Sequence, residues 1–209
     1  SGLWLDLGCG TGWNQTVLAA LDSKRSSVGI DLSEGMLRFA RAKGLSVVRG
    51  DAQRLPFHND AFDGILAKGV LHHLPDLELA VAEIKRVLKP NGVAVLVDPN
   101  PSPLRKLQAL QRNRERHFSH LHRSIQPGQY RSIISKHLQI DAFQYFGLLA
   151  YQLAFPDILP FRSFSGFVHT LIKPLIACDS GLSKIPLLKK LCWAYLLIGK
   201  KRPAEGAFK

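Results

Sequence analysis

An alternating glycine loop after a short apolar run constrains this chain more than any other feature. The run Leu3-Trp4-Leu5-Asp6-Leu7 is typical of a buried parallel strand. Gly8, Gly10 and Gly12 follow at every second position, and apolar residues at helical spacing come next. A glycine turn between a strand and a helix lets a ligand approach backbone amides at the helix N-terminus. The loop therefore predicts a nucleotide-like ligand.

Strand-like and helix-like segments alternate beyond the loop, which predicts an α/β fold with a parallel sheet covered on both faces. We expect a Rossmann-like, doubly wound, mostly parallel sheet of seven strands, with a helical insertion before the last strand. The expected strands are 3–7, 27–31, 46–49, 62–67, 93–97, 138–146 and 191–199, the last favoured over a helix. The expected helices are 12–21, 34–43 after the N-cap Ser33, 77–88 before the turn Pro90-Asn91-Gly92, 104–115, and 127–137.

The length of 209 residues suits one domain with a modest appendage. We expect a core at 1–148, an apolar and basic helical insertion facing the acceptor or a membrane at 149–190, and a closing strand with a basic tail at 191–209. The chain opens on Ser1 and reaches strand-like sequence within three residues, so we expect a truncated N-terminus. No apolar run reaches about 18 residues, the length needed to span a bilayer.

Acidic residues at the ends of successive strands narrow the identity of the ligand. The loop lacks the GxGxxG spacing of dinucleotide sites, and Asp6 just before it would repel a pyrophosphate. That acid suits the cationic methionine end of S-adenosylmethionine. Asp31 lies where a carboxylate accepts from ribose hydroxyls, and Asp51 with the Ala52 amide can read adenine. Each acid alone could be a helix cap, but together they predict a site for this methyl donor.

Several motifs in order, over roughly residues 3–100, resemble class I methyltransferases of the ubiquinone and menaquinone biosynthesis type, the methyltransferase type 11 family. They are LDLGCGTG, GIDLSEGMLRFARAK, GDAQRLPFHNDAFDGILAKGVLHHLPD and EIKRVLKPNGVAVLVDPN. The resemblance implies that Asp6, Gly8 and Gly10 hold the methionine moiety and Asp31 the ribose. It implies that the adenine lies against Leu32, Met36, Asp51 and Ala52, and that residues 71–74 run beside the cofactor. The expected cofactor-binding set also includes Cys9 and Lys68. Cys9 is a small packing residue of the loop, and Lys68 stands where the family often has a small or polar residue.

Two adjacent histidines are the candidate catalytic residues. An oxygen or nitrogen acceptor must lose a proton, and histidine is suited to accept it near neutral pH. His72 and His73 lie at the carboxyl edge of the sheet, and as neighbours we expect their side chains to point different ways. The alternative is that they pack beneath the loop.

No metal site is expected. The three cysteines are far apart and suit reduced thiols in the cytosol. The histidines of the stretch 116–123 (His117, His120 and His122, beside Arg123) lack a zinc-type motif. A loop facing the acceptor or a phosphate is preferred to a metal role, and a solvated basic surface is the alternative.

The formal net charge of +12 favours an anionic partner, and nucleic acid, acidic lipid headgroups and phosphorylated substrates are the alternatives. Lysine and arginine interleave with phenylalanine and leucine beyond residue 155, which is typical of a protein lying on an anionic membrane. We therefore expect a small or lipid-linked hydrophobic acceptor, handled in the cytoplasm, with peripheral contact at the inner face of the membrane. One alternative is an RNA methyltransferase, although the sequence has no nucleic-acid-binding motif. The other is a non-catalytic scaffold that binds S-adenosylmethionine.

Overall fold

The computed structural model describes residues 2–103, 125–148, 174, 176–179 and 181–203. Seven strands form one sheet in the order β3-β2-β1-β4-β5-β7-β6. The strands are β1 (Gly2–Leu7), β2 (Arg25–Asp31), β3 (Val47–Arg49), β4 (Phe62–Lys68), β5 (Leu88–Pro99), β6 (Gln139–Phe146) and β7 (Ala194–Lys200). The first five pair in parallel, whereas β7 runs antiparallel between β5 and β6. The predicted fold class and the closing strand are confirmed.

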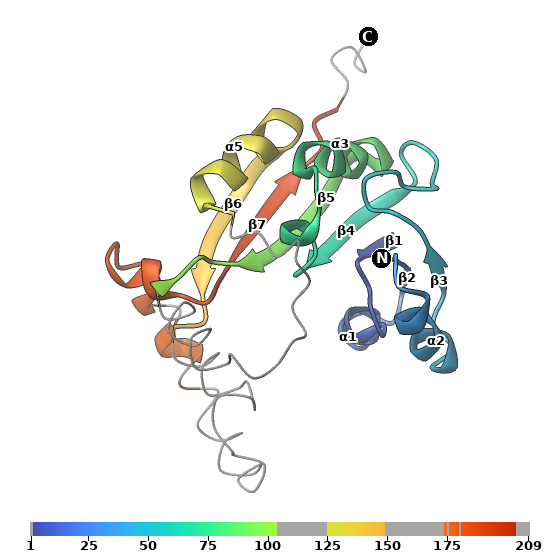
Figure 1. Cartoon of the computed structure of the whole chain (residues 1–209), viewed down its shortest axis with the longest axis horizontal. Helices are drawn as coiled ribbons and strands as arrows, with labels where there is room; N and C mark the ends of the chain where they lie inside the picture. Colours follow the sequence, from blue (N-terminus) through green and yellow to red (C-terminus); the bar gives the residue numbers. More distant parts are fainter. Residues whose placement is uncertain (1, 104–124, 149–173, 175, 180, 204–209) are drawn as a thin grey trace, which may run out of the picture.

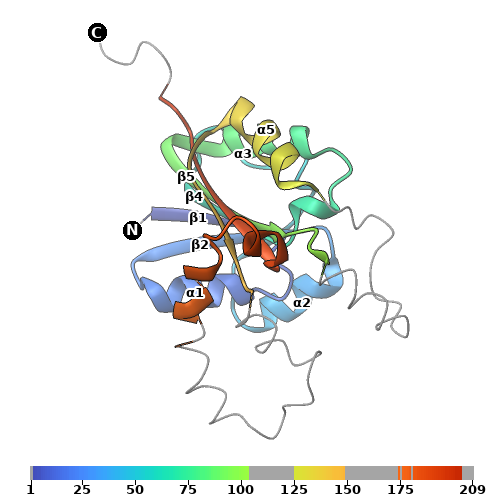
Figure 2. The same ribbon diagram turned by 90° about the vertical axis from the view of Figure 1, so that its left-hand side faces the viewer.

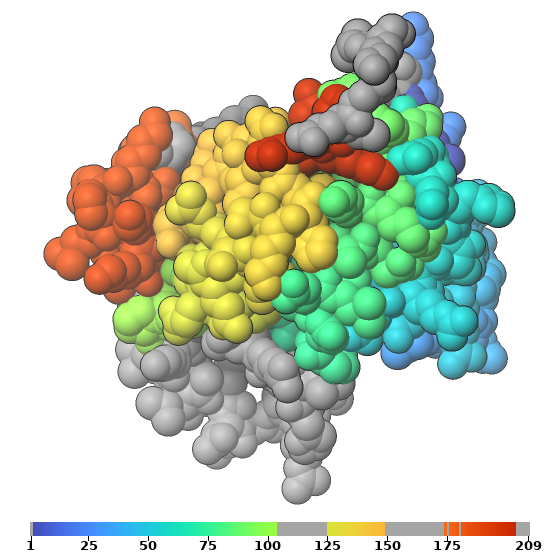
Figure 3. All heavy atoms as spheres, turned by 90° about the horizontal axis from the view of Figure 1, so that it is seen from above, coloured from blue at the N-terminus to red at the C-terminus, as the bar shows by residue number. Residues whose placement is uncertain are grey.

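Helices cover both faces of the sheet (Figures 1 and 2). They are α1 (Trp13–Leu21), α2 (Glu34–Ala42), α3 (Leu77–Val87) and α5 (Pro127–His137), with short 3₁₀ turns η1 (Leu71–His73) and η3 (Leu188–Leu191). In Figure 2, α3 and α5 lie on one face, and α1 and α2 lie on the other. Figure 3 shows α5 and β6 side by side with α3 on the upper surface. This is a doubly wound arrangement.

The α3 sequence shows why these helices form and pack. Apolar residues recur every three or four positions, so that one stripe faces the sheet. Ala80, Val81, Ile84 and Val87 are all fully buried against a core that includes Leu5, Ile65 and Leu96 of the central strands. The Asp76 side chain accepts from the Leu79 amide, which begins the helix at the predicted place.

The start of β5 differs from the sequence prediction. The strand begins at Leu88, although Pro90-Asn91-Gly92 predicts a turn and a strand starting at Val93. Asn91 does adopt a turn conformation, with φ of 65°. Its amide donates to the Lys201 carbonyl, and the Lys201 amide donates to the Gly92 carbonyl. These bonds, and the pairing of Leu88 with Phe62 of β4 across a register shift, continue the strand through the turn.

Some predictions fall on residues that the structure does not describe. They concern the helix at 104–115, the histidines of 116–123 and most of the insertion at 149–190. Within that insertion, residues 176–179 are helical and η3 precedes β7. The division of the chain into 1–148, 149–190 and 191–209 stays a prediction.

Candidate functional site

The glycine loop lies at the carboxyl edge of the sheet, where ligands bind in open α/β folds. Gly8, Gly10 and Gly12 all have positive φ, at 69°, 52° and 80°. The amides of Gly8 and Cys9 donate to the Ile30 carbonyl of β2, at 2.8 and 3.0 Å, and so fix the loop. A Cβ on Gly8 would lie 2.6 Å from Val70, whereas one on Gly10 would meet nothing within 4 Å. Gly8 therefore serves packing, and Gly10 faces open space.

Asp6 is buried beneath this loop with an unsatisfied oxygen. Asn14 Nδ2 donates to its Oδ1 at 3.0 Å, whereas its buried Oδ2 has no partner with hydrogen-bond geometry among the described residues, although the Gln15 amide lies close enough to lower the pKa of the carboxyl. Burial raises the pKa of the Asp6 carboxyl to about 6. The charge of Asp31 raises this pKa and that of Lys68 lowers it, so both groups lie within electrostatic reach of Asp6. A buried unpaired carboxylate oxygen at an open loop is suited to a cationic ligand.

Asp31 ties the loop to the start of α2. Its Oδ2 accepts from the Gly10 amide and its Oδ1 from the Ser33 amide, both at 2.8 Å. Leu32 and Met36 are exposed beside it, with 66% and 47% of their surfaces accessible. The structure therefore brings the predicted ribose-binding acid to the glycine loop and leaves two apolar side chains open nearby.

The loop after β3 carries Asp51 and Ala52. Asp51 is exposed, and its Oδ1 accepts from the Gln53 amide at 2.8 Å, while Ala52 is nearly buried. Two α3 residues that the sequence analysis missed hold the following residues of this loop. Glu83 accepts from the Leu55 amide, and Arg86 donates to the carbonyls of Leu55 and Phe57.

Cys9 and Lys68 complete the predicted set. The Cys9 side chain is buried, and burial is the main cause that raises the pKa of its thiol to about 12. A thiol in that state is a packing group rather than a nucleophile. Lys68 ends β4 with an exposed side chain.

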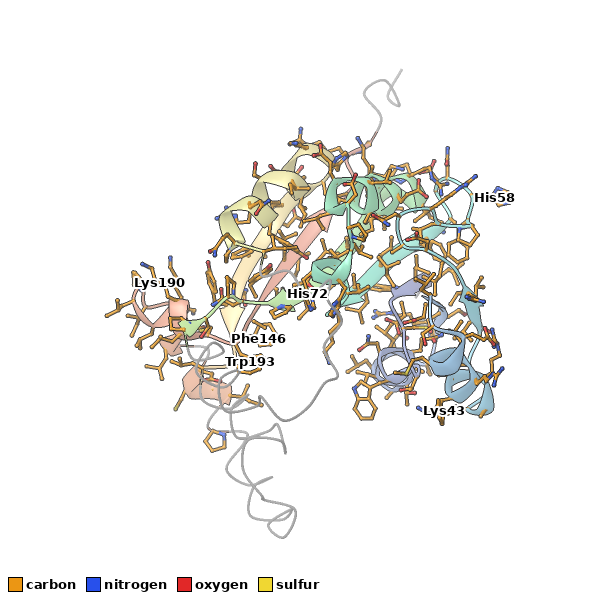
Figure 4. All side chains as sticks on the ribbon, in the orientation of Figure 1. Lys43, His58, His72, Phe146, Lys190 and Trp193 are labelled. Atoms are coloured by element: carbon orange, nitrogen blue, oxygen red, sulfur yellow. The ribbon has the colours of Figure 1, made fainter. Side chains whose placement is uncertain are left out.

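His72 belongs to a buried polar network, at the position labelled in Figure 4. Its Nδ1 lies 2.6 Å from Asp98 Oδ1, and the Tyr130 hydroxyl donates to Asp98 Oδ2 at 2.8 Å. All three residues are at most 4% exposed. Because the carboxylate accepts, Nδ1 carries the hydrogen of this bond.

His73 does not point away from His72 as predicted, because the two ring centroids are 3.9 Å apart. Both residues belong to the short 3₁₀ turn η1, and their rings are tilted against each other at 40°. Burial, and then the nearby His72, lower the pKa of His73. Asp98 and Tyr130 were not predicted from the sequence, although Asp98 lies near the end of β5 as Asp6 and Asp31 lie near the ends of β1 and β2.

No group of three or more histidine, cysteine or acidic side chains that could hold a metal ion occurs in the described part of the chain.

Comparison with known proteins agrees with this geometry. Residues 5–96 match the family model described as a methyltransferase domain. A demethylmenaquinone methyltransferase of Staphylococcus aureus is 38% identical over 106 residues, which are 48% of this chain and 44% of that protein. A malonyl-[acyl-carrier protein] O-methyltransferase of Legionella pneumophila is 38% identical over 109 residues, 50% of this chain and 38% of that protein. The chain thus spans less than half the length of these curated relatives.

Solved structures show the same fold at lower identity. A methyltransferase in complex with the Trm112 activator of Haloferax volcanii superposes with a TM-score of 0.69, at 19% identity, over 97% of this chain and 83% of that one. An S-adenosylmethionine-dependent methyltransferase of Thermotoga maritima gives 0.65 at 19% identity, over 97% and 83%. A [4+2]-cyclase gives 0.66 at 20% identity, over 97% and 75%, so the fold also serves other reactions. Residues 5–96 thus match a methyltransferase domain, and the Rossmann-like sheet and the glycine loop agree with S-adenosylmethionine, the cofactor that this match implies.

Proposed function

We propose that this chain transfers a methyl group from S-adenosylmethionine to a small or lipid-linked hydrophobic acceptor. The unpartnered Asp6 Oδ2 beneath the open Gly10 loop carries the proposal, because it offers a buried anionic acceptor to a cationic ligand. When bound, S-adenosylmethionine supplies an electrophilic methyl group on a sulfonium.

The residues present fit this cofactor. Asp6 and the amides of the glycine loop would hold the methionine end, and Asp31 would accept from the ribose hydroxyls. The exposed side chains of Leu32 and Met36 would cover the adenine, which Asp51 and Ala52 would recognise. Lys68 would lie near the same end of the sheet as Asp6, where its charge suits an anionic group of the ligand or the acceptor.

We assign His72 Nε2 as the base that accepts the proton of an oxygen or nitrogen acceptor. Asp98 supports this role because it orients the ring and stabilises the imidazolium that forms. His73 is the matched control, since it is a neighbouring histidine whose ring lies against that of His72. His72→Asn is expected to lower the rate of methyl transfer by about a hundredfold and His73→Asn by less than about fivefold. Equal losses in the two variants would contradict the assignment.

The acceptor class rests on the surface at the end of β5. Asn100 Nδ2 donates to the Cys192 carbonyl at 2.8 Å, and Ser102 Oγ donates to the Leu191 carbonyl at 3.1 Å. These bonds attach the segment before β7 to the strand that carries Asp98. Figure 4 shows Lys190 and Trp193 in this region.

That segment presents apolar and basic side chains together, which we name the basic apolar surface. It comprises Ile176, Lys184, Ile185, Leu187 and Lys190, all of them exposed. Such a surface suits the headgroup region of an anionic membrane, and hence a lipid-linked acceptor. The quinone and acyl-carrier-protein relatives support an acceptor of this kind. No helix of the described residues is both long and apolar enough to cross a bilayer.

Two experiments test the proposal. Calorimetry should detect binding of S-adenosylmethionine, and labelled methyl donor should mark a product in lipid extracts rather than in polar extracts or RNA. Labelling of RNA alone would favour the alternative acceptor, and absence of cofactor binding would reject the activity.

A flotation assay with phosphatidylglycerol vesicles tests the membrane contact separately. Leu187→Glu should reduce recovery with the vesicles severalfold. Leu21→Glu is the matched control, because Leu21 and Leu187 are both 74% exposed and Leu21 lies on α1. An equal effect of the two substitutions would show that the basic apolar surface is not the contact.

A further inference from the structure

A tight turn after β3 carries Asp51, the acid that would recognise the adenine amine. The Gln53 amide donates to Asp51 Oδ1 at 2.8 Å, and the Arg54 amide donates to the Asp51 carbonyl at 3.0 Å. The other carboxylate oxygen, Oδ2, has no hydrogen bond within the described ranges. Because Asp51 is exposed, the direction of its carboxylate depends on what holds the turn 51–54.

The start of α3 holds this turn through one side chain. Gln53 Oε1 accepts from the Asp76 amide at 2.9 Å. Asp76 is the N-cap of α3, and its own side chain accepts from the Leu79 amide at 3.0 Å. Gln53 therefore contacts the helix through its side chain and Asp51 through its amide, so that a single residue joins the acid to α3.

An ion pair on the last turns of α3 holds the residues that follow the turn. Arg86 donates to both carboxylate oxygens of Glu83, each at 2.7 Å. Its other N–H groups donate to the carbonyls of Leu55 and Phe57, at 2.9 and 2.7 Å, and to Asn59 Oδ1 at 3.0 Å. A guanidinium has five N–H donors, and all five are engaged here. Three of them bind the chain between β3 and β4.

Glu83 binds the same segment from the acidic side of the pair. Its Oε2 accepts from the Leu55 amide at 2.8 Å, so both backbone groups of Leu55 contact the ion pair. The hydrogen bond from Arg86 lowers the pKa of the Glu83 carboxyl, which is therefore ionised at neutral pH. Figure 1 shows the connection from β3 to β4 running beside α3. The helix thus holds this connection at two places, first at Gln53 and then at residues 55–59.

We propose that Gln53 and Arg86 are positioning residues that make the site selective for adenine, because they fix the turn of Asp51 and Ala52 against α3. This role rests on the proposed binding of S-adenosylmethionine at the site. A carboxylate held in one direction discriminates against a base that lacks the exocyclic amine, since it is then left without its donor. Both residues act through the backbone of the turn and take no part in the chemical step.

Adenosine and inosine test this role without turnover, because inosine carries an oxygen where adenosine carries the amine. In the unchanged chain, calorimetry should show adenosine bound at least about tenfold more tightly than inosine. Arg86→Met should reduce this ratio to about twofold, mainly through weaker binding of adenosine, because Asp31 would still hold the ribose of both ligands. Lys136→Met is the matched control and should keep the ratio, since the Lys136 amine pairs with another acid of α3, Glu78, at 2.9 Å.

Gln53→Ala tests the same role if Arg86→Met folds poorly, because it removes a single partly exposed side chain. It should lower the ratio about threefold, whereas Gln53→Glu, which can still accept from the Asp76 amide, should keep it. Gln139→Ala, at an exposed glutamine of β6, is its control. An unchanged ratio in Gln53→Ala, or in a folded Arg86→Met chain, would overturn the proposal. Absence of adenosine binding by the unchanged chain would reject the cofactor site itself, and this role with it.

Discussion

Asn14 Nδ2 donates to Asp6 Oδ1 at 3.0 Å, and the second oxygen of this buried carboxylate has no partner among the described residues. A buried half-satisfied carboxylate destabilises the chain on its own, because the charged form has lost water without full replacement. A cationic group beside the carboxylate would offset this cost. Asp6 therefore links the stability of the chain to its proposed cofactor.

Asp6→Asn should stabilise the ligand-free chain at neutral pH. The pKa of Asp6 is about 6 in the folded chain and has an ordinary value of 3.8. Between these two pH values, Asp6 is protonated in the folded chain and ionised in the unfolded chain. The stability of the original chain therefore falls as pH rises from about 4 to about 6 and is constant above that. Urea denaturation should show the variant more stable by on the order of 2–3 kcal/mol above about pH 7, and little different near pH 4.

The same substitution should weaken binding of S-adenosylmethionine by about tenfold or more at neutral pH, because it removes the anionic acceptor. Asp141→Asn, at an exposed acid on β6, is the control for a change of charge alone. A variant that is more stable yet binds equally well would show that Asp6 does not face the cofactor.

Asp31→Ala should weaken cofactor binding by on the order of 1–3 kcal/mol. The loss has two sources, since Asp31 would accept from the ribose and also accepts from the Gly10 amide at 2.8 Å. Asp31→Asn separates them: one amide oxygen can still accept from Gly10, so the loop is largely kept. Calorimetry should rank the affinities as unchanged chain, then Asn, then Ala. Unaltered affinity in both variants would remove Asp31 from the site.

Local patterns in the sequence were enough to predict the sheet and most of the cofactor site. Asp6, Asp31 and Asp51 lie at or just after the ends of strands, and the apolar run of each strand predicts where it ends. Parallel strands bring their carboxyl ends to one edge of the sheet. His72 was found through its chemical type. Asp98 and Tyr130 were missed because their pairing depends on where α5 packs, 32 residues away in the chain. The contacts of Arg86 with the loop after β3 likewise depend on tertiary packing rather than on any local pattern.

Gly10→Ala should abolish cofactor binding at a modest cost in stability. Gly10 and Gly44 both have positive φ, 52° and 75°, and a Cβ on either would meet nothing within 4 Å. Both substitutions to alanine should therefore cost about 1 kcal/mol of folding free energy from the left-handed backbone. Only at Gly10 would the added methyl group enter the proposed cofactor site. Thermal denaturation should show similar stabilities for the two variants, and calorimetry should show different affinities for S-adenosylmethionine. Equal binding by Gly10→Ala and Gly44→Ala would argue against the site.

Cys9 should be chemically inert, although it lies in the glycine loop. Burial raises the pKa of its thiol to about 12, and Cys192 is buried as well, whereas Cys178 is exposed. Since the thiolate is the reactive form, a thiol reagent should label Cys178 rapidly in the folded chain and the other two only after denaturation. Cys9→Ala should retain methyl transfer within about threefold, because the Cys9 side chain has a packing role and no chemical one. It lies close to Gly29 of β2, beside Gln15 of α1. Mass spectrometry of the labelled chain identifies the reactive cysteine. Rapid labelling of Cys9, together with loss of activity in Cys9→Ala, would assign Cys9 a chemical role instead.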